Sequence, residues 1–118
     1  MQKLTNKEEE LIELLWQHGA MFVKDIVALY DEPKPHFNTI STMVRTLEAK
    51  GFLDHEVFGN TYRYFPIISQ EEFSKGVLGN VVTRYFDNSY KHVVSALIKE
   101  DKISGEELEE LIRKVQNQ

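Results

Sequence analysis

The sequence predicts a mainly α-helical protein with a single β-hairpin between its third and fourth helices. Apolar residues recur at helical spacing in six separate segments. Three Ser/Thr-x-x-Glu sequences mark helix starts, and a Gly-Asn pair between alternating residues marks one hairpin. We expect residues 1–68 and residues 69–118 to form two domains, because strand-like sequence gives way to a capped helix at this point.

Composition limits the class of protein. A chain of 118 residues with 42% hydrophobic content suits one small domain with a helical extension. It contains no cysteine, which excludes disulfides and thiolate metal sites. We find no signal peptide and no apolar run long enough to span a bilayer, so we expect a cytoplasmic protein without membrane insertion.

The first helix is expected over residues 5–18. Thr5 and Glu8 have the spacing of a capping box, in which each side chain bonds the other residue's backbone N–H. Three leucines then form an apolar stripe, and Gly19 suits the left-handed conformation that ends a helix.

A short edge strand and a second helix are expected next. Met21 and Phe22 form a short apolar segment, which suits a small edge strand. Apolar residues then recur at helical spacing over residues 23–30. Pro33 and Pro35 end this helix, because prolines lack a backbone donor and restrict the residue before them.

The third helix is expected over residues 37–50. Ile40, Val44 and Leu47 fall within a narrow arc of the helical wheel, which predicts the buried face. The opposite face carries short polar side chains and Arg45.

The hairpin is expected over residues 53–65. Leu53, His55 and Val57 alternate with Asp54 and Glu56, and Gly59-Asn60 favours a primed two-residue turn. Residues 61–65 are strong strand formers. Pro66 ends the pairing or lies at an edge, because it cannot donate to a sheet.

Three more amphipathic helices are expected after residue 68. Ser69 with Glu72 and Ser104 with Glu107 are further capping boxes, and residues 87–89 separate the first two of these helices. A domain this small cannot bury all three apolar stripes, so we expect two copies to share a core, with packing inside one chain as the alternative. The candidate dimerisation residues are Phe73, Val77, Val81, Tyr85, Leu97, Leu111 and Ile112.

Three short helices followed directly by a hairpin is the order of a winged helix-turn-helix domain. Its third helix fits the major groove of DNA, and the hairpin, or wing, lies beside it on the backbone or minor groove. Short polar residues and an arginine on this helix suit contact with base edges. The predicted DNA-binding residues are Asn38, Thr39, Ser41, Thr42 and Arg45 in the helix, and Asn60, Thr61 and Arg63 in the wing.

The net charge of −5 opposes DNA binding, because non-specific affinity comes from Lys and Arg that neutralise phosphates. Acidic residues crowd the first helix, however, whereas residues 33–68 carry four Lys or Arg against three Asp or Glu. The predicted reading surface is therefore close to neutral or slightly basic. An ordinary solvated face, or a winged helix that contacts only proteins, is the alternative.

No enzyme, metal or cofactor is expected. His18, His36, His55 and His92 share no metal-ligand spacing, and we interpret them as surface or capping residues. The sequence shows no Gly-rich phosphate loop and no nucleophile beside a base.

The third helix and the wing resemble the BlaI/MecI/CopY family of penicillinase-repressor-like regulators. The matching positions are Thr39, Thr42, Arg45, Leu47, Lys50, Gly51, Gly59, Tyr64 and Pro66. The resemblance implies a homodimeric repressor on an inverted repeat of double-stranded DNA, with dimerisation through C-terminal helices.

The resemblance also implies two possible release signals. In the penicillinase branch, a membrane metallopeptidase system cleaves an Asn-Phe bond in the C-terminal region. In the copper branch, a C-terminal cysteine cluster senses the metal. This chain has no Asn-Phe dipeptide and no cysteine, so the resemblance leaves the inducing signal open.

Overall fold

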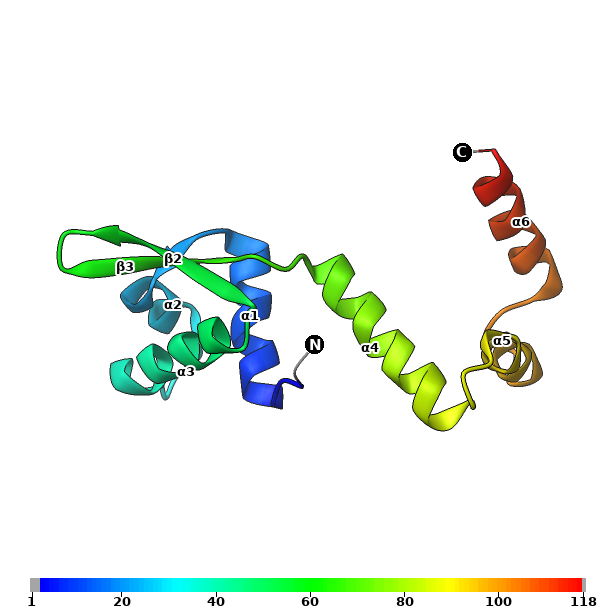
Figure 1. Cartoon of the computed structure of the whole chain (residues 1–118), viewed down its shortest axis with the longest axis horizontal. Coiled ribbons are helices and arrows are strands. Elements are labelled where there is room, and N and C mark those ends of the chain that lie inside the picture. The colour runs from blue at the N-terminus through cyan, green and yellow to red at the C-terminus, as the bar shows by residue number, and fades with distance from the viewer. Residues whose placement is uncertain (1–2, 118) are drawn as a thin grey trace. The chain divides into compact units, whose positions relative to one another are not determined.

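The computed structural model of the chain describes residues 3–117 (Figure 1). It confirms a mainly helical fold with one small antiparallel sheet. The elements in order are α1 (Asn6–His18), β1 (Met21–Phe22), α2 (Val23–Leu29), α3 (Phe37–Ala49), β2 (Leu53–Phe58), β3 (Thr61–Pro66), α4 (Gln70–Tyr85), α5 (Tyr90–Lys99) and α6 (Gly105–Gln116). The chain divides into two compact units after Ser74.

Two of the three predicted capping boxes form completely. At the start of α1, the Thr5 hydroxyl accepts from the Glu8 N–H at 3.2 Å, and the Glu8 carboxylate accepts from the Thr5 N–H at 2.8 Å. The reciprocal pair also forms at the start of α6. At Ser69 the prediction is half right. The Ser69 hydroxyl accepts from the Glu72 N–H, but the Glu72 carboxylate bonds this hydroxyl instead of the backbone.

The sheet has β3 in the middle, between β1 and β2. Met21 pairs with Tyr64, which confirms the predicted edge strand. β2 and β3 form the predicted hairpin, in which Phe58 pairs with Thr61 across a turn where Gly59 has a φ of 58°. Figure 1 shows that the turn projects beyond α2 and α3.

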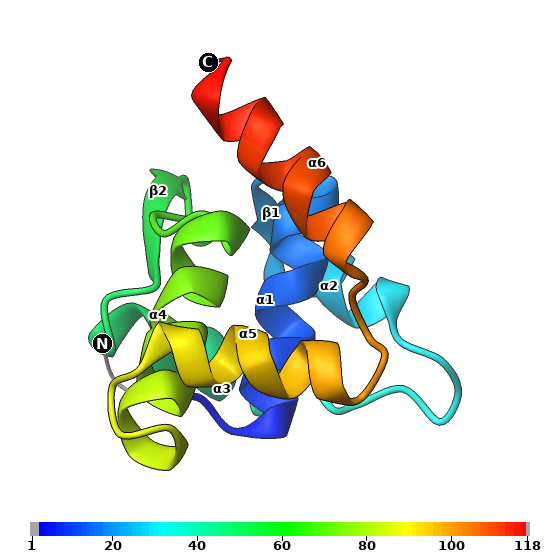
Figure 2. The same ribbon diagram turned by 90° about the vertical axis from the view of Figure 1, so that its right-hand side faces the viewer.

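The connection from α2 to α3 is an open loop over residues 30–36 (Figure 2). It holds the two prolines that were predicted to end the second helix. The Lys34 Nζ donates to the backbone oxygens of Ala28 and Tyr30, so a cation satisfies carbonyls at the end of α2.

The core of the N-terminal unit joins α1, α2, α3 and the sheet. Its fully buried large side chains are Leu11, Ile12, Leu15, Ile26, Ile40, Val44, Leu47, Phe52 and Leu53. The buried face predicted for α3 is therefore confirmed. With that face fixed in the core, the opposite face of α3 is left to solvent.

The beginning of α4 packs on this same core. The Trp16 Nε1 donates to the Ile68 carbonyl at 2.9 Å. The Phe73 ring lies 5.7 Å from the Trp16 ring and 5.9 Å from the Phe52 ring, measured between centroids. Phe73 was predicted as a dimerisation residue. The half-buried Phe73 ring also packs on the core of its own chain, a contact that the sequence did not predict because Trp16 and Phe52 are distant in sequence.

A nearly buried ion pair fixes the C-terminal end of α3 to the start of α1. The Lys50 Nζ lies 2.8 and 3.0 Å from the two carboxylate oxygens of Glu8, and it also donates to the Lys3 carbonyl at 3.3 Å. Glu8 is only 6% exposed. The carboxylate therefore caps α1 and orients α3 at the same time.

We expect the Glu8→Gln variant to be destabilised by about 1–3 kcal/mol at pH 7, the usual cost of leaving a buried partner unsatisfied. Burial raises the pKa of Glu8, but hydrogen bonds from Lys50 and Thr5 outweigh it, and the pKa lies below its ordinary value. A carboxyl whose pKa is lower in the folded protein than in the unfolded chain stabilises the fold at pH values above the unfolded pKa. This stabilisation is lost as the pH falls through the folded pKa.

Urea unfolding at pH 7 and at several pH values below about 4.5 tests this prediction. The wild type should lose more stability with acid than Glu8→Gln does. Glu13→Gln is the matched control, because Glu13 lies exposed on the same helix. Equal acid dependence in wild type and Glu8→Gln would contradict the assigned role of the ion pair.

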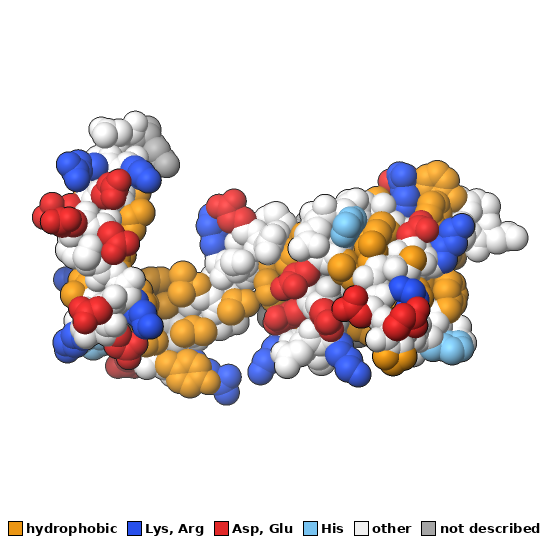
Figure 3. Space-filling model, turned by 180° about the vertical axis from the view of Figure 1, so that it is seen from behind, with side chains coloured by type: hydrophobic (Ala, Val, Ile, Leu, Met, Phe, Trp, Pro, Cys, Tyr) orange, Lys and Arg blue, Asp and Glu red, His pale blue; other side chains and the backbone are white. Residues whose placement is uncertain are grey.

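The C-terminal unit leaves most of its apolar side chains exposed (Figure 3). Val82 is the one buried residue of α4, and no described residue of α5 or α6 is buried. The exposed large hydrophobics include Val77, Val81, Tyr85, Leu97, Leu111 and Ile112, which are the remaining candidate dimerisation residues. No helix within residues 3–117 is long and apolar enough to cross a membrane.

Candidate nucleic-acid interface

The solvent-facing side of α3 carries most of the predicted DNA-binding residues. Asn38, Thr39, Thr42 and Arg45 are exposed, and Ser41 is half-buried. A shallow depression follows this face, and its lining residues are Thr42, Arg45, Thr46, Ala49 and Lys50. Short side chains surround the arginine, so another surface can approach the helix closely.

The N-terminus of α3 is fixed by the histidine that precedes it. The His36 Nδ1 accepts from the Asn38 N–H at 3.1 Å. His36 is therefore the N-cap of the helix, which confirms a capping role for one of the four histidines. The cap occupies the backbone N–H of Asn38, and the exposed Asn38 side chain lies in the first turn of the reading face.

Arg45 differs from the other cations near α3. Its Nε donates to the Ser41 carbonyl at 3.2 Å, which holds the side chain along the helix. Within residues 3–117 it forms no ion pair, whereas Lys50 is paired with Glu8 and Arg63 with Glu56. Among the described residues, the Arg45 guanidinium is thus a cation on the exposed side of α3 that is not neutralised by an Asp or Glu side chain.

A groove separates the start of α3 from the wing. It has a volume of about 390 Å³, and its lining residues are Val23, Lys24, Phe37, Ser41, Asn60, Thr61, Tyr62 and Tyr64. The structure therefore brings three predicted residues together here, Ser41 from the helix and Asn60 and Thr61 from the wing.

Sequence reasoning did not select Lys24, Phe37 or Tyr62 for this surface. Lys24 lies on α2, at an exposed position that the amphipathic pattern alone does not distinguish from any solvated lysine. Phe37 is 51% exposed and Tyr62 is 45% exposed, although both belong to types that are usually read as core. The packing of α2, α3 and the hairpin against one another brings them to the groove, and such contacts between distant segments do not follow from local pattern.

Arg63 lies apart from this groove. It is paired across the hairpin with Glu56, and the Arg63 Nη2 to Glu56 Oε2 distance is 3.3 Å. Its guanidinium also lies 4.8 Å from the centroid of the Phe58 ring. Because side chains alternate along a strand, Arg63 is on the opposite sheet face from Tyr62 and Tyr64.

The comparisons with known proteins agree on one family. Residues 4–117 match the penicillinase repressor family. A penicillinase repressor of Bacillus licheniformis is 24% identical over 110 residues, which cover 92% of this chain and 86% of that protein. The methicillin resistance regulatory protein MecI of Staphylococcus aureus strain N315 is 20% identical over 110 residues, which cover 92% of this chain and 89% of that protein.

The match runs through both compact units, from α1 to α6, and includes the third helix and the wing on which the resemblance was based. This protein therefore belongs to the penicillinase repressor family.

Proposed function

We propose that the chain is a transcriptional repressor that binds a palindromic DNA operator as a homodimer. The observation that carries this proposal is the exposed face of α3, where Arg45, which forms no ion pair with any described residue, lies among short polar side chains. The similarity to proteins named as a penicillinase repressor and a methicillin resistance regulatory protein supports it. We assign DNA binding to residues 1–68 and dimerisation to residues 69–118.

In this proposal α3 enters the major groove. The Asn38 amide is suited to the edge of an adenine, and the Thr42 methyl to a thymine methyl. The Arg45 guanidinium offers paired donors to a guanine edge or a phosphate. The groove beside α3 would receive the DNA backbone, where Lys24 supplies charge and Asn60 and Thr61 supply hydrogen-bond donors.

The exposed apolar residues of α4–α6 support the dimer. A soluble protein seldom leaves so many large apolar side chains in water, and a second copy covers them by two-fold symmetry. Two recognition helices related by that symmetry match two half-sites about one DNA turn apart. This linkage compensates for the acidic net charge, because each half-site needs only a modest affinity.

We also propose that cleavage within α4–α6 by a membrane metallopeptidase system relieves repression, because it would break the dimer. The chain has no Asn-Phe dipeptide, so the cleaved bond would be a different one. A metallopeptidase gene beside this one would support the mechanism. Mass spectrometry of the protein recovered from induced cells would then identify the cleaved bond. Recovery of only the intact chain from induced cells would contradict release by cleavage.

In vitro selection from random double-stranded DNA, followed by fluorescence anisotropy, tests the repressor proposal. We expect an inverted repeat to be enriched and bound more tightly than random DNA, with an affinity that falls as salt rises. If selection enriches no sequence and binding is absent at low salt, the winged helix serves protein contacts only.

Arg63→Ala is expected to weaken DNA binding much less than Arg45→Ala, because Arg63 interacts with the wing itself. Loss of its ion pair should lower the free energy of unfolding by about 0.2–1 kcal/mol. Anisotropy and urea unfolding of the two variants measure both effects. An affinity loss as large as that of Arg45→Ala would instead place Arg63 at the DNA.

A further inference from the structure

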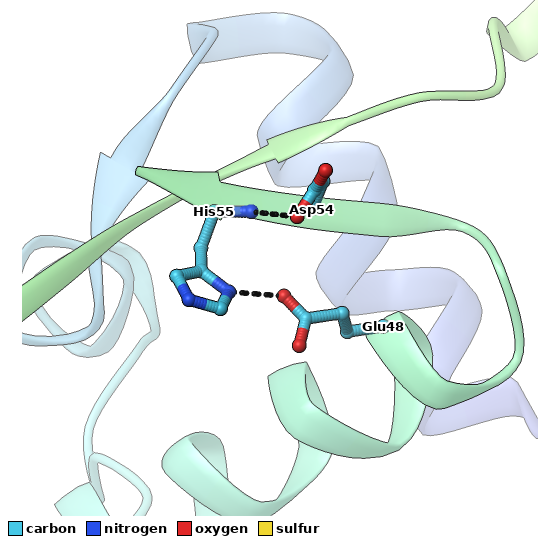
Figure 4. A group of neighbouring side chains, drawn as sticks. All are labelled: Glu48, Asp54 and His55. Carbon is cyan, nitrogen blue, oxygen red and sulfur yellow. Dashed lines mark hydrogen bonds and ion pairs between the residues drawn. The ribbon is translucent and has the colours of Figure 1, made fainter. Parts of the chain in front are cut away.

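Three possible metal ligands meet where the last turn of α3 contacts β2 (Figure 4). Glu48, Asp54 and His55 each offer one ligand atom, and these atoms lie within 4.8 Å of one another. The His55 Nδ1 is hydrogen-bonded to the Glu48 Oε1. The Asp54 Oδ1 accepts from the His55 backbone N–H at 2.8 Å. One imidazole therefore stands beside two carboxylates.

We propose that these three side chains form a binding site for a divalent transition-metal ion, for which Zn²⁺ is the best-matched probe. An imidazole with carboxylates is a donor set that Zn²⁺ accepts, whereas Mg²⁺ and Ca²⁺ prefer oxygen ligands alone. Three protein ligands leave the fourth tetrahedral position to water. The ion takes the place of the hydrogen bond between the His55 Nδ1 and Glu48, and the neutral imidazole then carries its single proton on Nε2.

The histidine is held in place before any ion binds. Its ring centroid lies 4.3 Å from that of Tyr62 and 5.5 Å from that of Tyr64, and Tyr64 is only 3% exposed. The side chains of His55 and Glu48 are 26% and 30% exposed, so an ion can reach them from solvent. The imidazole is thus held in place, and the cluster is accessible to an ion that draws the two carboxylates inward.

The local charge favours a cation. Within residues 3–117, neither Glu48 nor Asp54 forms an ion pair with a lysine or arginine. Of the neighbouring cations, Lys50 is occupied by Glu8, and Arg45, one turn before Glu48 on α3, has its Nε on the Ser41 carbonyl. Two carboxylates balance the charge of a divalent ion, and the ion replaces no existing Lys or Arg contact.

An ion here would join the recognition helix directly to the wing, because its ligands come from α3 and β2. We expect it to fix the angle between these two elements and so to raise operator affinity. This consequence rests on the proposed function, whereas metal binding itself does not. The two are therefore measured separately.

Isothermal titration of ZnCl₂ into the full chain tests the site. We expect one bound ion per chain, no heat from MgCl₂, and a visible absorption band when CoCl₂ is used instead. His55→Gln, Asp54→Asn and Glu48→Gln should each weaken Zn²⁺ binding by more than about tenfold. His92→Gln is the matched control, because His92 lies exposed on α5 and outside the cluster.

Circular dichroism of the variants verifies that they are folded, and Asp54→Asn changes only an exposed side chain. Absence of Zn²⁺ binding to the wild type would overturn the proposal. So would binding that survives His55→Gln, or that falls equally in His92→Gln. If Zn²⁺ binds as expected but no DNA is bound with or without it, the metal site stands and the repressor function fails.

Discussion

Replacing Arg45 with alanine is expected to weaken operator binding by about 10- to 100-fold, the usual effect of losing one bidentate contact to a base. The side chain is exposed and makes no ion pair within the described residues, so its removal leaves the core intact. The hydrogen bond from its Nε to the Ser41 carbonyl lies on the surface of α3. The loss should therefore appear in DNA affinity and not in the free energy of unfolding.

Two further variants sharpen this test. Arg45→Lys keeps the charge but loses the planar pair of donors, so it should restore phosphate attraction but little base discrimination. Lys7→Ala removes one positive charge from an exposed position on α1 and should change affinity little. Equal affinities for Arg45→Ala and wild type, measured by anisotropy, would show that α3 does not read the DNA.

A lysine in place of Leu111 is expected to convert the dimer to a monomer and to lower affinity for the inverted repeat by about 10²- to 10⁴-fold. Leu111 is 49% exposed in the single chain, and its apolar neighbour Ile112 is 48% exposed. A charge at the centre of an apolar interface must be buried without a partner, which dimerisation cannot offset. The large loss follows because two linked half-sites would then be bound one at a time.

Light scattering and anisotropy on the same samples test this prediction. Glu110→Lys is the matched control, since it places a lysine at the adjacent position, which a helical wheel puts away from the Leu111 stripe. It should remain dimeric and keep its affinity. A dimeric Leu111→Lys variant would contradict the assignment of α6 to the interface, and unchanged affinity in a monomer would contradict the need for two linked sites.

Local rules were sufficient to predict most of the fold. Capping boxes, helical spacing and the Gly-Asn turn depend on residues within a few positions of one another, and the structure confirms the elements that they predicted. The short Met21-Phe22 strand could also be predicted, because these two apolar residues lie between two segments of helical spacing. The half-formed box at Ser69 shows that spacing specifies the candidates for a cap but not which bonds they make.

The roles of individual side chains were harder to predict, because they depend on contacts between distant segments. Phe73 shows the periodicity of an interface residue, and its half-buried ring also contacts Trp16 and Phe52 at the edge of the N-terminal core. Arg63 shows the chemistry of a phosphate contact, yet the hairpin register pairs it with Glu56. His55 shows no metal-ligand spacing in the sequence, because Glu48 reaches it from another element.

The central claim is that two copies of this chain read two half-sites of DNA through α3. It is tested most directly by measuring affinity for the selected inverted repeat as base pairs are inserted between its halves. We expect tight binding at the selected spacing and a sharp loss when about five base pairs, half a helical turn, are added, because the second α3 then faces the wrong side of the duplex. Equal affinity at every spacing would contradict the account.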